Sequence, residues 1–404
     1  MVALKWHELD GFTVCVAFES KGSAIFTELT DYSIYLSCEK ALAETTVINE
    51  LRYVAGFLAE LKRGRRLIAN VDDDFIRKWR DAEFVRVREN PIARNDSHTM
   101  KRTVNAKLRR IYDFYWWYQR RKSSLRNIIG PTGQIISSGS IDSMLSPRNA
   151  HSKARRGGSS HIYPLCFRNV GAGSKHRVAT IPTISKIDEI RKILSAKELG
   201  FMEQRNLLML SIAEETGLRR AAINSLRVSQ FSEELLLEMD EGGLVVVPDV
   251  QKFSYQSSVR FSPGLCLLIL NFAKQCLMPF CRQRGWSPSY GNGRLFISER
   301  NGKPLEASSL TRIFSRAFRR AGFQKGSAIH LVRHHFTNVE IVKETERRLK
   351  AGLDTSLPTI CEAVSFKLNH LDPMSIRAYV SAVISDLAAE MEKNVRAEAK
   401  FEAK

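Results

Sequence analysis

Five side chains in the C-terminal half of this 404-residue chain are of the types that act on phosphate groups. His330 and Arg333 are three residues apart, so on a helix they point to the same side. His370 lies in the sequence L-N-H-L-D-P, and Tyr379 follows it nine residues later. A second arginine, Arg219, ends the sequence T-G-L-R, which comes after the apolar stretch R-N-L-L-M-L-S-I-A-E-E.

These side chains suit the attack of an oxygen nucleophile on a phosphate. A guanidinium group binds two phosphate oxygens at once and keeps its charge at neutral pH. The phenol of Tyr379 has a reference pKa of about 10, so it is a poor nucleophile unless neighbours stabilise the phenolate or take its proton. Arg219 and Arg333 would therefore hold the phosphate while the histidines assist the attack.

Local patterns indicate which elements position these groups. Asp372 is a favourable N-cap and Pro373 a favourable first helical residue, so we expect a helix from about Pro373 that carries Tyr379 in its second turn. The sequence L-V-V-V-P at 244–248 predicts a strand, and the segment after it predicts a hairpin with Lys252 near its bend.

In their order and spacing, Arg219, His330-x-x-Arg333, His370 and Tyr379 resemble the catalytic signature of the tyrosine recombinases, the lambda-integrase family. The resemblance covers the C-terminal half of the chain. It implies that Tyr379 attacks a DNA phosphate to give a 3′-phosphotyrosine, that the two arginines clamp the phosphate oxygens, that His330 handles the tyrosine proton and that His370 donates a hydrogen bond to the phosphate.

The family also places a catalytic lysine on a hairpin, and the resemblance assigns this role to Lys252; the alternative is an ordinary exposed turn lysine. The covalent phosphotyrosine stores the energy of the phosphodiester bond, so the implied reaction needs no cofactor. In agreement with that, the sequence has no Walker loop and no acidic metal-binding motif.

The sequence departs from the family pattern in three places. Ala222 stands where the family usually has an acid that supports the first arginine, Asn369 replaces the usual glycine before the histidine, and residues 343–358 look inserted. His334 and His335, which follow the motif, are interpreted as packing residues or as residues behind the catalytic ones. Because of Ala222, a catalytically inactive DNA-binding accessory protein of the same fold stays as the alternative to an active recombinase; a type IB topoisomerase uses closely related chemistry.

Charge and cysteine content limit the kinds of partner and the cellular location that the protein can have. The chain carries 62 Lys and Arg against 43 Asp and Glu, a net charge of +19, which favours a polyanionic partner without choosing between DNA, RNA and an anionic membrane. Seven cysteines without a C-x-x-C pair indicate reduced core residues of a cytoplasmic protein. The apolar run at 266–273 is too short to span a bilayer, so we expect no membrane association.

The predicted fold is mainly α with a small antiparallel β-sheet in the catalytic domain. Residues 1–44 form an extension, in which the β-branched and aromatic runs at 13–18 and 32–36 predict short strands. Residues 45–122 form a helical DNA-binding domain, residues 123–180 a basic linker and residues 181–404 the catalytic domain. The first helix of the DNA-binding domain is predicted from an apolar face formed by Val47, Leu51, Val54, Leu58 and Leu61.

Basic side chains in three regions are candidates for contacts with DNA phosphates, although solvated helix faces would show the same pattern. They are Lys101, Arg102, Arg109 and Arg110 on a predicted helix, Arg155 and Arg156 in the linker, and Arg312 and Arg316 on a later helix. The resemblance implies double-stranded DNA as partner and a homo-oligomer, a dimer on each site and a tetramer in synapsis. The apolar face that continues after Tyr379 would then dock on a neighbouring protomer or, alternatively, pack on its own domain.

Overall fold

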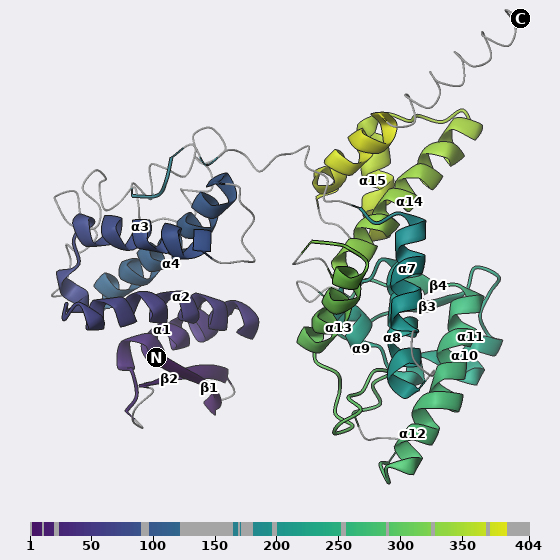
Figure 1. Cartoon of the computed structure of the whole chain (residues 1–404), viewed down its shortest axis with the longest axis horizontal. Coiled ribbons are helices and arrows are strands. Elements are labelled where there is room, and N and C mark those ends of the chain that lie inside the picture. The colour runs from purple at the N-terminus through teal and green to yellow at the C-terminus, as the bar shows by residue number, and fades with distance from the viewer. Residues whose placement is uncertain are drawn as a thin grey trace, which may run out of the picture. The chain divides into compact units, whose positions relative to one another are not determined.

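A computed structural model describes residues 2–385 of the chain, apart from 10–11, 20–23, 90–96, 122–164, 169, 171–180, 196–199, 252–255, 288–290, 325–327 and 369–371. The chain divides into two compact units, residues 1–173 and residues 174–404 (Figure 1). The described residues are mainly helical, and each unit contains one two-stranded antiparallel sheet. This agrees with the predicted fold class.

The N-terminal unit packs a helical bundle beside a β-hairpin. Strand β1 pairs with β2 over their full length, and α4 packs against α2 and α3. Its elements are β1 (Val2–Leu9), β2 (Phe12–Glu19), α1 (Thr27–Ile34), the π-helix η1 (Tyr35–Glu39), α2 (Glu44–Arg63), η2 (Ile68–Asn70), α3 (Asp73–Glu89) and α4 (Ser97–Arg121). The apolar face predicted for α2 is confirmed, since all five of its residues are buried.

The first 44 residues share the core of this unit. Cys15 and Ala17 of β2 and Leu29 of α1 are buried together with residues of α2 and α4. The strand predicted at 32–36 is wrong, because Tyr32 and Leu36 lie on a helix. Both side chains are buried in the same core as α4, and the rings of Tyr32 and Phe114 meet edge to face with their centroids 5.2 Å apart. Packing therefore overrides the preference of these residue types for strands.

One part of the predicted linker is docked on the N-terminal unit. The side-chain amide of Asn105 on α4 donates to the Phe167 carbonyl at 2.9 Å and accepts from the Phe167 N–H at 2.8 Å. The Arg80 guanidinium donates to the Leu165 carbonyl and stacks over the Phe167 ring at 4.4 Å. Leu165 and Cys166 are buried in the core, so these residues belong to the first unit rather than to a free linker.

The C-terminal unit is built around α8. Met209, Leu210, Ile212 and Ala213 are almost fully buried, which shows that α8 is covered on most sides by its neighbours. The elements are α7 (Ile184–Leu194), α8 (Phe201–Thr216), α9 (Arg220–Ser225), η5 (Val228–Phe231), α10 (Glu233–Leu237), β3 (Leu244–Val246), β4 (Val259–Phe261), α11 (Pro263–Phe272), the π-helix η7 (Ala273–Leu277), α12 (Met278–Gln283), α13 (Ala307–Arg320), α14 (His330–Lys350), α15 (Leu357–Leu368) and η8 (Pro373–Ile376).

The apolar run at 266–273 is part of a longer helix. Elements α11, η7 and α12 form one continuous helix of 21 residues, Pro263–Gln283, and an 18-residue window in it has a mean hydropathy of 1.5. By length and composition this helix could cross a membrane, so the prediction that the run is too short was based on only part of the element. Cys266 and Ile269 are fully buried in the core of the unit, as in a core helix.

The long helix α14 takes up the first half of the segment that looks inserted in the sequence, residues 343–350. Glu344 is buried on this helix, where its carboxylate binds the guanidinium groups of Arg347 at 2.7 Å and Arg348 at 2.8 Å. Lys367 of α15 reaches Glu344 at 3.6 Å and Glu340 at 3.2 Å. These ion pairs fix α15 against the C-terminal half of α14.

All seven cysteines are free thiols, and six of them are buried.

The helix after α15 begins where it was predicted to begin. Asp372 caps the next helix, since its carboxylate accepts from the Met374 N–H at 2.9 Å, and the helix continues through Tyr379 to residue 385.

Candidate active site

Arg219 is positioned by the tight turn that ends α8. The helix stops at Gly217, whose φ of +59° is rarely adopted by residues with a side chain, and Arg219 is then the N-cap residue of α9. A β-carbon on residue 217 would lie 2.2 Å from a ring carbon of Phe336 on α14. The absent side chain therefore allows α14 to approach the turn closely, which places Arg219 next to the first turns of that helix.

Arg333 on α14 links three separate segments. Its guanidinium donates to the carbonyl of Gly217 and, at 2.8 Å, to the carbonyl of Leu368 at the end of α15. Only 7% of Arg333 is exposed. Burial, together with the nearby positive charge of Arg219, lowers the pKa of Arg333 to about 9. The two positive charges thus repel each other, and a bound anion would reduce that repulsion.

His330 and His334 lie one turn apart on the same face of α14. Their ring centroids are 4.5 Å apart in an edge-to-face arrangement. His330 is exposed by surface area, yet the protein atoms around its ring lower its pKa, with further contributions from Arg333, Arg219 and Arg220. Burial lowers the pKa of His334 to about 4, and His330 and Arg333 add to this effect. Both imidazoles are therefore shifted towards the neutral form.

Tyr379 reaches this group from the helix that follows η8. Its hydroxyl lies 2.7 Å from Nδ1 of His334, and the two rings are nearly parallel, with centroids 5.4 Å apart. Tyr379 is half-buried and packs against the core formed by α14, α15 and its own helix. This burial raises the pKa of the phenol. The hydroxyl is thus held by the His334 imidazole, whose pKa is lowered in part by Arg333.

We compared this architecture with known proteins. No protein-family model and no curated protein matches the sequence. Among solved structures, the chain is similar to the XerH site-specific recombinase bound to a palindromic difH substrate in a post-cleavage complex. That match has a TM-score of 0.52 and 15% identity, and it covers 92% of this chain and 85% of that one. The chain has the tyrosine-recombinase fold.

Two further solved structures match with lower TM-scores. The Tn1549 transposon integrase in complex with transposon right end DNA has a TM-score of 0.49 at 13% identity, over 91% of this chain and 98% of that one. A lambda integrase tetramer bound to a Holliday junction has a TM-score of 0.46 at 12% identity, over 90% of this chain and 92% of that one.

Within this tyrosine-recombinase fold, four of the six predicted catalytic residues are described, and the chain brings them together. Arg219, His330 and Arg333 interact electrostatically with one another, and Tyr379 joins them through His334. The other two predictions, His370 and Lys252, lie outside the described residues.

Sequence analysis missed the direct contact of His334 with Tyr379. The available signal was its position four residues after His330, which places both imidazoles on one face of a helix. Ala222, in the position that the family usually gives to an acid, is buried in the core of the C-terminal unit and leaves no carboxylate there. Within the part of the chain that the structure describes, His, Cys, Asp and Glu nowhere gather into a group that could hold a metal ion.

The predicted phosphate-contacting residues differ in how far their charges are already engaged. On α4, Arg110 binds Glu50 at 2.7 Å, Arg102 donates to the Thr99 hydroxyl, and the exposed Arg109 interacts with the Cys166 thiol. The ammonium of Lys101 lies over the Phe167 ring. Contacts to DNA by these four residues would therefore require rearrangement or sharing of these interactions. Arg155 and Arg156 lie outside the described residues.

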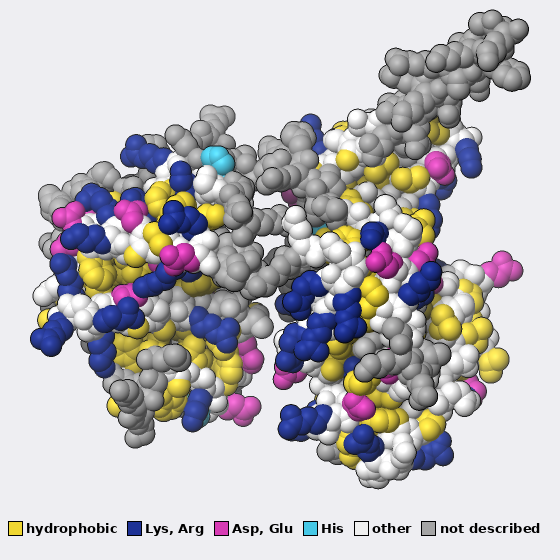
Figure 2. Space-filling view, in the orientation of Figure 1, with side chains coloured by type: hydrophobic (Ala, Val, Ile, Leu, Met, Phe, Trp, Pro, Cys, Tyr) yellow, Lys and Arg dark blue, Asp and Glu magenta, His cyan; other side chains and the backbone are white. Residues whose placement is uncertain are grey.

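Helix α13 presents a continuous basic face. Its buried side holds Leu310, Phe314 and Phe318, and its exposed side holds Arg312, Arg316, Arg319 and Arg320. Figure 2 shows Lys and Arg side chains gathered over this helix. The two predicted candidates on this helix, Arg312 and Arg316, are therefore exposed, and their role in binding DNA stays a prediction.

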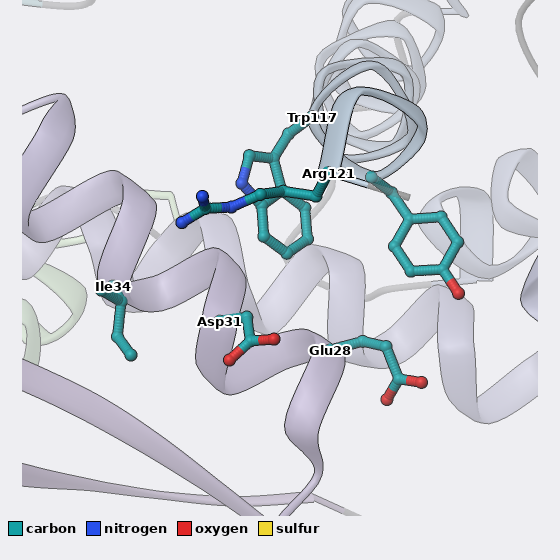
Figure 3. Close-up of a pocket in the computed structure, with 6 residues that line it drawn as sticks. Glu28, Asp31, Ile34, Trp117 and Arg121 are labelled. Atoms are coloured by element: carbon teal, nitrogen blue, oxygen red, sulfur yellow. The ribbon is translucent and has the colours of Figure 1, made fainter. Parts of the chain in front are cut away.

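A separate cavity lies in the N-terminal unit between α1 and the end of α4. It has a volume of about 300 Å³ and contains none of the predicted catalytic residues. Its lining consists of Glu28, Asp31, Ile34, Trp117, Tyr118 and Arg121 (Figure 3).

Proposed function

We propose that the protein is a site-specific DNA recombinase that cleaves and rejoins double-stranded DNA through a 3′-phosphotyrosine on Tyr379. The observation that carries this proposal is the convergence of two arginines and a hydrogen-bonded tyrosine from three distant parts of the sequence. Burial and the neighbouring charge of Arg219 lower the pKa of Arg333, which in turn acts on His334, the residue that contacts the Tyr379 hydroxyl. A phosphodiester would bring negative charge to this group of positively charged side chains.

In the proposed reaction, the Tyr379 oxygen attacks the phosphorus and the bond from phosphorus to the 5′-oxygen breaks. Arg219 and Arg333 stabilise the charge that develops on the non-bridging oxygens. His330 assists transfer of the tyrosine proton, His370 donates a hydrogen bond to the phosphate, and Lys252 protonates the leaving 5′-oxygen. Attack by a 5′-hydroxyl on the phosphotyrosine reverses these steps and rejoins the strand.

The second part of the proposal concerns DNA binding. The exposed arginines of α13 lie in the same unit as the catalytic residues, and their positions on one face suit contacts to successive phosphates. The N-terminal helical unit and the basic segment between the units would add contacts that depend on the salt concentration. We propose that two copies fill one recombination site and that four act together in synapsis.

The helix that carries Tyr379 bears on how the copies associate. Val380 and Val383 are buried against α14 and α15 of their own unit, so the first part of this apolar face packs in its own protomer. Leu387, Ala388 and Met391, which continue the face in the sequence, lie outside the described residues. If they dock on a neighbour, truncation after Ser385 should spare binding of one copy to a half-site but weaken cooperative binding of the second. Unchanged cooperativity in a gel-shift titration would assign the whole helix to its own domain.

The decisive experiment is covalent trapping on a DNA substrate with a nick that releases the leaving strand. The wild-type protein should form an adduct that resists denaturation, and Tyr379→Phe should abolish it without a loss of DNA affinity. An adduct that persists in this variant, or that maps to Tyr255 or Tyr290, would refute the assignment. Arg219→Ala should slow trapping at least about a hundredfold, since loss of one charge-stabilising donor typically costs about 3 kcal/mol.

A matched variant separates chemistry from binding. Arg316→Ala on the exposed face of α13 should weaken DNA binding and leave the rate of trapping at saturating protein unchanged, the reverse of Arg219→Ala. If the two variants lose binding and cleavage in parallel, Arg219 only docks the DNA. The alternative, an inactive DNA-binding protein that lost activity with the acid at position 222, predicts DNA binding without any adduct in the wild type.

A further inference from the structure

His334 is the residue in direct contact with the reactive atom of Tyr379. Its Nδ1 lies 2.7 Å from the phenol oxygen, and the near-parallel rings keep the imidazole edge and the hydroxyl in register. On its other side the His334 ring meets His330, with ring centroids 4.5 Å apart. The residue therefore stands between the nucleophile and the first residue of the H-x-x-R motif.

The direction of the hydrogen bond depends on the tautomer of His334. The phenol carries its proton at neutral pH, because burial raises its pKa above the ordinary value. When the imidazole proton is on Nε2, the hydroxyl donates and Nδ1 accepts. Burial, together with His330 and Arg333, lowers the pKa of His334 to about 4, so the imidazole is neutral and Nδ1 can accept in this tautomer.

From this geometry we propose that His334 is a catalytic residue of the phosphoryl transfer, the base that accepts the Tyr379 proton. As the bond from the phenol oxygen to phosphorus forms, the O–H bond breaks and the proton moves to Nδ1, which gives an imidazolium. The 5′-oxygen leaves with the electron pair of its bond to phosphorus and takes a proton from a separate donor. On rejoining, the tyrosine oxygen leaves phosphorus and recovers its proton from Nδ1.

The charges of the site favour this transfer only when DNA is bound. The pKa of His334 is lowered by burial and by the neighbouring His330 and Arg333. A phosphodiester bound between the arginines would place a negative charge beside the same groups and make the imidazole a better base. The base would then be active when substrate is in place. This inference rests on the proposed function and refines it, because the proton reaches His334 first and His330 is the next imidazole along α14.

Two substitutions separate proton transfer from positioning. Asparagine at position 334 puts its carbonyl oxygen close to the place of Nδ1, so it can accept the hydrogen bond but cannot take the proton. In His334→Asn and His334→Ala alike, single-turnover trapping on the nicked substrate should slow at least about a hundredfold while DNA affinity is unchanged. The rate of His334→Asn should also rise with pH, since Tyr379 must then ionise to the solvent. His335→Ala, at the adjacent position of α14, is the matched control and should cleave at the wild-type rate.

The outcomes distinguish the two proposals. If His334→Asn cleaves at the wild-type rate, His334 only positions the hydroxyl, and the inference is overturned. A rate in His334→Ala equal to or above that of the wild type also overturns it, since the contact would then be dispensable or inhibitory. In both cases the wild-type adduct and its loss in Tyr379→Phe would leave the recombinase assignment standing. Absence of an adduct in the wild type would overturn both.

Discussion

Replacement of Gly217 by alanine tests the geometry on which the site depends. The residue has a φ of +59°, where an alanine is disfavoured by about 1 kcal/mol or more. The added methyl carbon would lie 2.2 Å from Cδ1 of Phe336, well inside contact distance, and overpacking of this kind costs about 1–3 kcal/mol. Together the two effects should lower the free energy of unfolding of the C-terminal unit by about 2–4 kcal/mol.

The assay is urea unfolding of the full chain followed by two probes. Four of the five tryptophans lie in residues 1–173, so fluorescence reports mainly on the N-terminal unit, whereas circular dichroism reports on both units. Gly217→Ala should shift the transition seen by circular dichroism and leave most of the fluorescence transition in place. Trapping should also slow, because the carbonyl of residue 217 accepts a hydrogen bond from Arg333.

Gly322→Ala is the matched control. Its φ is +83°, and a β-carbon there has no neighbour within 4 Å, so it carries the conformational cost without the steric one. If the two variants lose the same free energy of unfolding, the methyl group added at residue 217 does not clash with Phe336. If Gly217→Ala loses no free energy of unfolding, residue 217 does not have the left-handed conformation. Restoration of part of the loss by Phe336→Leu in the Gly217→Ala background would support the steric account.

Three further measurements test other features. DNA affinity should fall linearly with salt on a double-logarithmic plot, and Arg316→Ala should reduce the slope by about 1; a flat plot would contradict phosphate contact. The Arg347 guanidinium helps to hold the pKa of Glu344 at about 2, below the reference value of 4.5. Stabilisation by this carboxylate is therefore complete above pH 4.5 and is lost as the pH falls towards 2, so Glu344→Gln should be less stable than the wild type at pH 7 and equal to it near pH 2. Asn105→Ala should speed amide hydrogen exchange at Phe167, whose N–H donates to the Asn105 side chain; unchanged exchange would show that this contact does not hold the segment.

The candidate site was largely predictable because its signature is local. His330 and Arg333 are brought together by one helical turn, and the start of the helix before Tyr379 is encoded by Asp372 and its following proline. These relations depend on residue types a few positions apart. The convergence of the separate segments was expected only from the resemblance, since nothing in the local sequence specifies it.

Long-range packing explains the features that the sequence did not predict. The ring of His334 meets Tyr379 because the helix that carries Tyr379 packs against α14. This packing is determined by the burial of Ile376 and Val380 in one core with Ile341 and Ile360. The helix at residues 32–36 likewise follows from a core that α4 completes. A single-sequence pattern carries no information on which distant surface an apolar face will meet.

The contact between Asn105 and Phe167 has a consequence for the proposed binding of one DNA duplex by both units. Since Phe167 is fixed to the N-terminal unit, the covalent tether between the units begins there and not at the end of α4. From Phe167 to Ile181 the chain can span at most about 50 Å, at roughly 3.6 Å per residue. Residues added between 122 and 164 would leave the length of this tether unchanged, because Arg121 and Leu165 both belong to the first unit, whereas residues added between 171 and 180 would lengthen it. Insertions in the second segment alone should therefore lower the effective concentration of one unit for the DNA held by the other, and with it the gain in affinity from joining them.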